Sequence, residues 1–89
     1  MNLVAMIGIV EAIQKDKTIT NIKLKVEKPF FETRDGLDGY YDNFNIELNN
    51  SIFKTDLKLI ENGTLIGLKG RVRNQDDTLK LIAEKIQVF

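Results

Sequence analysis

The sequence predicts an all-β fold, a small barrel of five strands with one short α-helix between the third and fourth strands. Several segments alternate apolar and polar residues, which is the pattern of strands with one buried face. A single segment places its apolar residues at helical spacing instead, and turn-forming residues separate the segments. Because 43% of the 89 residues are apolar, we expect one domain, residues 1–89, with its own core.

The first three strands differ in how their two faces are composed. Residues 2–13 are apolar on both alternating faces, which predicts a strand buried on two sides. Residues 18–29 carry lysines opposite their apolar side chains, so we expect a half-exposed strand, ended by Pro29. Asp-Gly turn signals in residues 30–42 predict a long hairpin tip, and the third strand follows over residues 43–49.

The period of the apolar residues changes after the third strand. Phe53, Leu57 and Ile60 recur at i, i+4 and i+7, which predicts a helix of about ten residues with one apolar face. Ser51 is a candidate cap for its first turn, and Gly63 fits a left-handed stop after its last. We expect the apolar face to close the bottom of the barrel.

The last two strands are predicted over residues 64–73 and 79–89. The polar run between them is typical of a turn, and its pair Asp76-Asp77 is expected to form a hairpin turn and not a metal site. Three strands, one helix and two strands in about ninety residues is the order of the OB-fold, a small partly open barrel. The sequence therefore predicts a five-stranded OB-fold barrel.

Composition excludes most kinds of catalytic site. The chain has no cysteine, no histidine and only one serine, so thiolate and imidazole chemistry and their metal sites cannot be built. We expect neither an enzyme nor a cofactor.

No apolar run approaches the ~20 residues of a membrane span, which predicts a cytoplasmic protein with no membrane partner. Thirteen basic and thirteen acidic residues cancel, so any polyanion site must come from local segregation of charge.

Four segments together form a recognisable pattern: "MNLVAMIG" at residues 1–8, "YYDNFNIEL" at 40–48, "GTLIGLKGRVR" at 63–73 and "LIAEKIQVF" at 81–89. This pattern resembles the bacterial single-stranded DNA-binding protein family. The resemblance implies an OB-fold that binds single-stranded DNA in replication, repair or recombination, as a homodimer or homotetramer. A core of this length also resembles the dimeric replication-restart primosomal branch of that family.

The sequence departs from the family pattern at three places. Ile9 follows Gly8 where the family usually has arginine, and no tryptophan lies near the end of the third strand, where residues 48–50 are Leu-Asn-Asn. The sequence ends at Phe89 without the family's flexible acidic tail. We therefore expect recruitment of replication proteins to be absent or supplied elsewhere.

Binding of single strands requires cations for the phosphates and aromatic faces for the bases. Five lysines against two acidic residues lie between positions 15 and 28, a local excess despite the neutral total. Further cations lie on the fourth strand, and aromatic residues flank the hairpin tip. We expect these residues to form a basic groove with stacking aromatics. The candidate nucleic-acid-binding residues are Lys15, Lys17, Lys23, Lys25, Lys28, Phe30, Phe31, Tyr40, Tyr41, Lys69, Arg71 and Arg73.

Other interpretations of the same residues stay open. Alternating lysines also protect an edge strand from aggregation, and aromatic pairs can simply stabilise a hairpin. The acidic hairpin, the neutral charge and the missing tryptophan favour a protein-binding OB adaptor as the alternative function. RNA is an alternative ligand, because OB barrels bind both nucleic acids.

Overall fold

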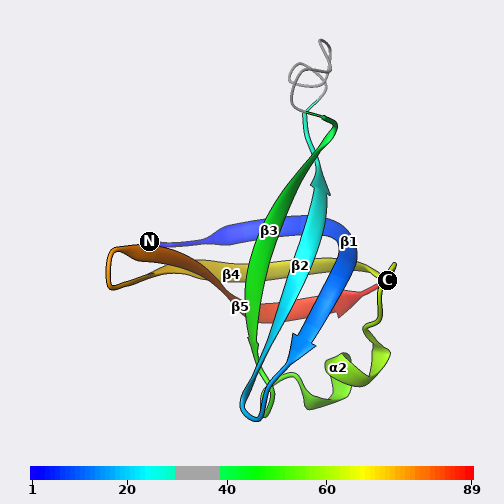
Figure 1. Cartoon of the computed structure of the whole chain (residues 1–89), viewed down its shortest axis with the longest axis vertical. Helices are drawn as coiled ribbons and strands as arrows, with labels where there is room; N and C mark the ends of the chain where they lie inside the picture. The colour runs from blue at the N-terminus through cyan, green and yellow to red at the C-terminus, as the bar shows by residue number, and fades with distance from the viewer. Residues whose placement is uncertain (30–38) are drawn as a thin grey trace.

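The computed structural model places five strands in a closed barrel (Figure 1) and describes residues 1–29 and 39–89. Around the barrel the strand order is β1-β2-β3-β5-β4, and β4 pairs again with β1. This order and the single helix confirm the predicted five-stranded OB-fold barrel. The elements are β1 Val4–Lys15, β2 Ile19–Glu27, β3 Tyr41–Asn49, α2 Lys54–Leu59, β4 Leu65–Gln75 and β5 Thr78–Val88.

Strand pairing bends β1 and leaves β2 and β3 as a long hairpin. Residues 4–9 of β1 pair with β4, and residues 9–15 pair with β2, with a bulge near Val10. Such bulges increase local twist and allow a strand to pass from one part of a barrel to another. The β2–β3 hairpin projects beyond the rest of the barrel (Figure 1). Of the described strand pairs, β3–β5 alone is parallel.

The barrel interior is filled by the apolar residues that alternate along each strand. Phe53 and Ile60, which flank α2, are buried with these strand residues, and Leu57 packs against them. The predicted apolar face of the helical segment is therefore confirmed. Burial of large apolar side chains stabilises the fold by roughly 1.5–3 kcal/mol each. The core residues are Val10, Ile22, Leu24, Ile46, Leu48, Phe53, Ile60, Ile66, Leu68 and Ala83.

Two glycines allow neighbouring strands to approach closely enough for closure. A Cβ atom at Gly8 would lie 2.5 Å from the carbonyl oxygen of Lys25, and one at Gly70 would clash with the carbonyl of Ile82. Any other residue at these positions would push a neighbouring backbone outward, which a closed barrel cannot absorb without strain.

The helix is shorter than predicted, and Ser51 does not cap it. It has six residues and no side-chain cap. In the turn that leads into it, the Asn49 side-chain oxygen accepts hydrogen bonds from the backbone N–H groups of Ser51 at 2.9 Å and Ile52 at 3.2 Å. Asn49 ends β3 and so turns the chain directly into the helical segment. Gly63 does have a left-handed φ of 95°, but the backbone is already extended at Ile60, so Gly63 serves the turn into β4.

Strand β1 is not buried on two sides within one chain, contrary to the prediction. Its inner face packs in the core, but its outer face is open, with Ile7 61% and Ile9 40% exposed. The described helix packs beside β5 and not against this face of β1. The β4–β5 hairpin turn is confirmed, since Asp76 and Asp77 both have positive φ, the requirement of a two-residue type I′ turn.

None of the helices in the described part of the chain has the length and apolar character needed to cross a membrane.

Candidate nucleic-acid interface

The outer face of the β2–β3 hairpin carries lysines and amides side by side. Lys23 and Lys25 project away from the buried face of β2, because they alternate with core residues. Directly opposite them on β3 lie Asn45 and Asn43. Amide side chains both donate and accept hydrogen bonds without carrying charge. This face can therefore offer charge to a phosphate and hydrogen bonds to a base edge.

An aromatic ring lies beside these lysines. The Lys25 Nζ atom lies 4.1 Å from the centroid of the Tyr41 ring, within the range of a cation–π contact. The Tyr41 side chain remains 43% exposed, so part of the ring is open to a ligand. The contact holds a cation and an aromatic face at one point of the hairpin.

The charges of Lys23 and Lys25 are not cancelled by neighbouring carboxylates. Their cross-strand neighbours on β1 are Ala12 and Ile9, and on β3 they are asparagines. Within residues 1–29 and 39–89, no carboxylate lies within ion-pair distance of either lysine. Among the described residues, therefore, no carboxylate competes with a phosphate for either ammonium group.

Lys15 and Lys17 lie at the β1–β2 turn, at the opposite end of β2 from Tyr41. Both are exposed, and a network centred on Asn50 holds their turn in place. The Asn50 amide nitrogen donates to the Asp16 carbonyl at 2.8 Å, and its oxygen accepts from the buried Thr20 hydroxyl at 2.6 Å. The turn is therefore anchored to the end of β3. Lys15 pairs with the buried Thr20, so its side chain lies on the opposite side of the sheet from Lys23 and Lys25.

The two arginines of β4 are paired within the chain. The Arg73 guanidinium lies 3.3 Å from the Glu47 carboxylate on β3, and Arg71 lies 3.9 Å from Glu84 on β5. Glu47 is largely buried, with a side chain 13% exposed, so its charge is held against Arg73. A phosphate would have to compete with these carboxylates.

The remaining candidate residues are dispersed. Lys69 is on β4, and β1 lies between β4 and β2, so Lys69 does not adjoin Lys23 and Lys25. Lys28 forms an ion pair with Asp42 at 4.0 Å, and Tyr40 is exposed beside them. Phe30 and Phe31 lie outside the described residues.

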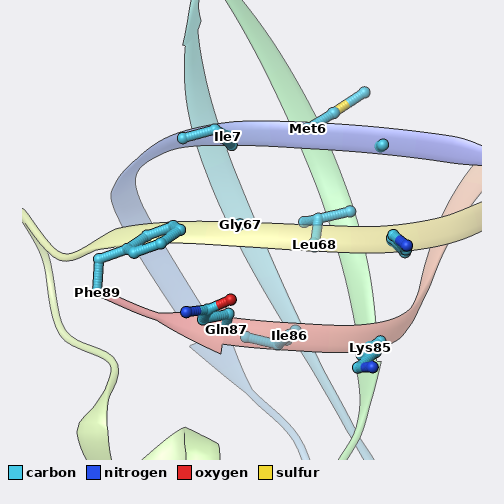
Figure 2. Close-up of a pocket in the computed structure, with 10 residues that line it drawn as sticks. Met6, Ile7, Gly67, Leu68, Lys85, Ile86, Gln87 and Phe89 are labelled. Atoms are coloured by element: carbon cyan, nitrogen blue, oxygen red, sulfur yellow. The ribbon is translucent and has the colours of Figure 1, made fainter.

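A second feature is a hollow of about 630 Å³ on the outer faces of β1, β4 and β5 (Figure 2). Lys69, Lys85 and Phe89 are among the residues that line this hollow. Of these three, only Lys69 was a predicted site residue. The alternation of the sequence does indicate the other two, because Ile86 and Val88 point inward and leave Lys85 and Phe89 on the outer face.

No cluster of residues able to hold a metal ion occurs in the part of the chain that the structure describes.

Several solved structures share this fold. The N-terminal domain of PriB from Thermoanaerobacter tencongensis, described as dimeric, is 21% identical over 99% of this chain and 96% of that chain, with a TM-score of 0.69. Rim1, a mitochondrial single-stranded DNA-binding protein of S. cerevisiae, is 16% identical over 98% and 92%, with a TM-score of 0.75. A small single-stranded DNA-binding protein from Mycoplasma pneumoniae is 18% identical over 98% and 85%, with a TM-score of 0.67.

No family model and no curated protein sequence matches this chain. At these identities the similarity establishes the fold, which is the OB-fold of PriB, Rim1 and the small single-stranded DNA-binding proteins. The resemblance found in the sequence is confirmed at that level.

Proposed function

We propose that this chain binds single-stranded DNA with little sequence preference through the outer face of β2 and β3. The observation that carries the proposal is the Lys25 ammonium group 4.1 Å from the centre of the exposed Tyr41 ring. Beside it lies Lys23, which forms no ion pair with any residue of 1–29 or 39–89. Cations that follow a backbone and aromatic rings that stack on bases are the two components of general single-strand binding.

Each group on this face has a role in the proposed complex. Lys23 and Lys25 bind successive phosphates, and Lys17 in the β1–β2 turn binds a phosphate further along. A base stacks on the open part of the Tyr41 ring, which favours no particular base because every base has a flat face. Asn43 and Asn45 bond to whichever base edge they meet, because an amide can donate or accept.

The cellular role follows from the ligand. Rim1 and the Mycoplasma pneumoniae protein have this fold and are single-stranded DNA-binding proteins. We extend that activity to this chain and place it in replication, repair or recombination, the processes that expose single strands. RNA remains the alternative ligand, and competition between matched thymidylate and uridylate strands separates the two, because only RNA offers the 2′-hydroxyl.

Titration of a labelled oligothymidylate of about 16 nucleotides, the upper size of one OB site, tests the proposal. Each phosphate bound by a lysine contributes about 0.7 to the slope of log affinity against log salt. Replacing Lys23 and Lys25 by alanine should therefore lower the slope by about 1.4 and the affinity at 0.1 M salt by roughly ten- to thirty-fold.

The matched control replaces Lys54 and Lys58, two exposed lysines of the α2 segment, and should leave both quantities unchanged. The proposal is wrong if the unaltered chain fails to bind at low salt, or if both pairs of substitutions have the same effect.

The unpaired edge of β1 favours assembly with a second copy. On the side away from β4, residues 4–8 have no strand partner in the described part of the chain, because pairing with β2 begins at Ile9. An unpaired edge is a template for another strand, and a pair of identical edges satisfies two-fold symmetry. We therefore include a homodimer in the proposal, and light scattering distinguishes it from a monomer of 10.2 kDa.

A further inference from the structure

The hollow on β1, β4 and β5 has an apolar part and a cationic end. Ile7, Gly67 and Phe89 form the apolar part, while Lys69 and Lys85 stand at the other end. Figure 2 shows Phe89 just after the end of β5 and Lys85 further back along the same strand, with Gln87 between them. A ligand that fills this hollow therefore needs a flat or apolar group and a negative group close together.

The Phe89 ring is exposed but held in position. Its side chain is 61% exposed, and the ring lies across Gly67, where a Cβ atom would come within 3.2 Å of it. The Phe89 backbone N–H donates to the Leu65 carbonyl at 3.1 Å, which fixes the chain at that point. The absent side chain at Gly67 allows the ring to lie flat along the strand, as a surface on which a base can stack.

Lys69 and Lys85 are direct cross-strand neighbours with the same charge. Such pairs repel each other and destabilise a sheet unless an anion lies near them. Neither lysine has a carboxylate within ion-pair distance among the described residues, and the nearby Glu84 pairs with Arg71. A phosphate bound between the two ammonium groups would remove this repulsion.

The hollow also adjoins the β2–β3 face. Lys25 pairs across strands with Ile9, Ile9 pairs with Leu65, and Leu65 bonds to Phe89. These are three interstrand steps, or roughly 14 Å at about 4.8 Å a step. A single strand that crosses β1 along this row reaches both Tyr41 and Phe89.

From these contacts we infer a second nucleotide subsite, in which Phe89 stacks on a base and Lys69 and Lys85 bind the neighbouring phosphate. The inference rests on the proposed function, because the subsite takes a further part of the same DNA strand. A purely apolar partner would leave the two lysines uncompensated, whereas a nucleotide satisfies both ends of the hollow.

The test uses Phe89→Leu, which keeps an apolar side chain but removes the ring, and Lys85→Gln, which removes one charge. With an oligothymidylate of about 16 nucleotides, Phe89→Leu should weaken binding about tenfold without changing the salt slope. Lys85→Gln should lower that slope by about 0.7.

With about four nucleotides, which the β2–β3 face alone can hold, both variants should bind as the unaltered chain does. Leu59→Ala and Lys58→Gln on the helix are the matched controls.

A photocrosslink from an iodouridine-substituted strand to Phe89, located by mass spectrometry, should accompany the loss of affinity. If the unaltered chain binds DNA but both variants bind both lengths equally well, the subsite is refuted while the proposed function stands. If the unaltered chain binds no DNA, the proposed function itself fails. If Phe89→Leu changes the mass measured by light scattering and leaves affinity intact, the hollow is an interface between copies and the subsite is refuted.

Discussion

At the scale of single residues, the partner of each cation decides whether it can serve a ligand. Lys23 and Arg73 both project outward from strands, and alternation predicts this for both. Only Arg73 has a carboxylate against it, from Glu47, which lies 26 positions away in sequence. The sequence could identify the candidate cations but could not separate free from paired ones, because pairing depends on which strands become neighbours.

Glu47→Gln tests this distinction. The substitution keeps a hydrogen-bonding side chain of the same shape but releases the Arg73 charge near the proposed strand path. We expect several-fold tighter binding of oligothymidylate and a salt slope increased by about 0.7. Anisotropy titration at several salt concentrations measures both.

Glu61→Gln makes the same change of net charge at an exposed position that has no ion pair among the described residues. Equal gains from the two variants would mean that net charge alone, and not release of Arg73, controls affinity.

At the scale of elements, periodicity predicts faces better than ends. The apolar spacing around α2 identified Phe53, Leu57 and Ile60 as its packed face, since that face depends on local sequence alone. The predicted cap at Ser51 was wrong, because the Asn49 side chain at the end of β3 closes the turn before the helix, and the helix itself has no side-chain cap. The bend of β1 was missed for a similar reason, since it follows from barrel closure.

Asn49→Ala should lower the free energy of unfolding by about 1 kcal/mol, because two backbone N–H groups lose their acceptor. Ser51→Ala should change it by less than about 0.5 kcal/mol. Urea denaturation of both variants measures the difference. A larger loss for Ser51→Ala would contradict the role described for Asn49 in the turn before the helix.

At the scale of the whole molecule, zero net charge conceals an uneven distribution. The lysines of β2 and the β1–β2 turn have no carboxylate partner among the described residues, while the arginines of β4 are neutralised by acidic residues of β3 and β5. A long-range field would not attract DNA to such a protein, so binding depends on local contacts and should be sensitive to salt.

The fold could be predicted more completely than the site. Strand order and core depend on patterns within each segment, and these patterns are plain in the sequence. The Lys25–Tyr41 contact and the hollow at Phe89 depend on register between strands, which no single segment contains. Lys25 could be named as a candidate, but its aromatic neighbour could not be assigned to it before the register was known.

The most direct test of the central claim is an NMR titration of the isotope-labelled chain with oligothymidylate. We expect the largest changes in amide chemical shift at Lys23, Lys25 and Tyr41 through Asn45, with smaller changes on the outer face of β1. The α2 segment should be unaffected. Changes centred on α2 or on the Asp76–Asp77 turn, with none on β2 and β3, would contradict binding through the β2–β3 face.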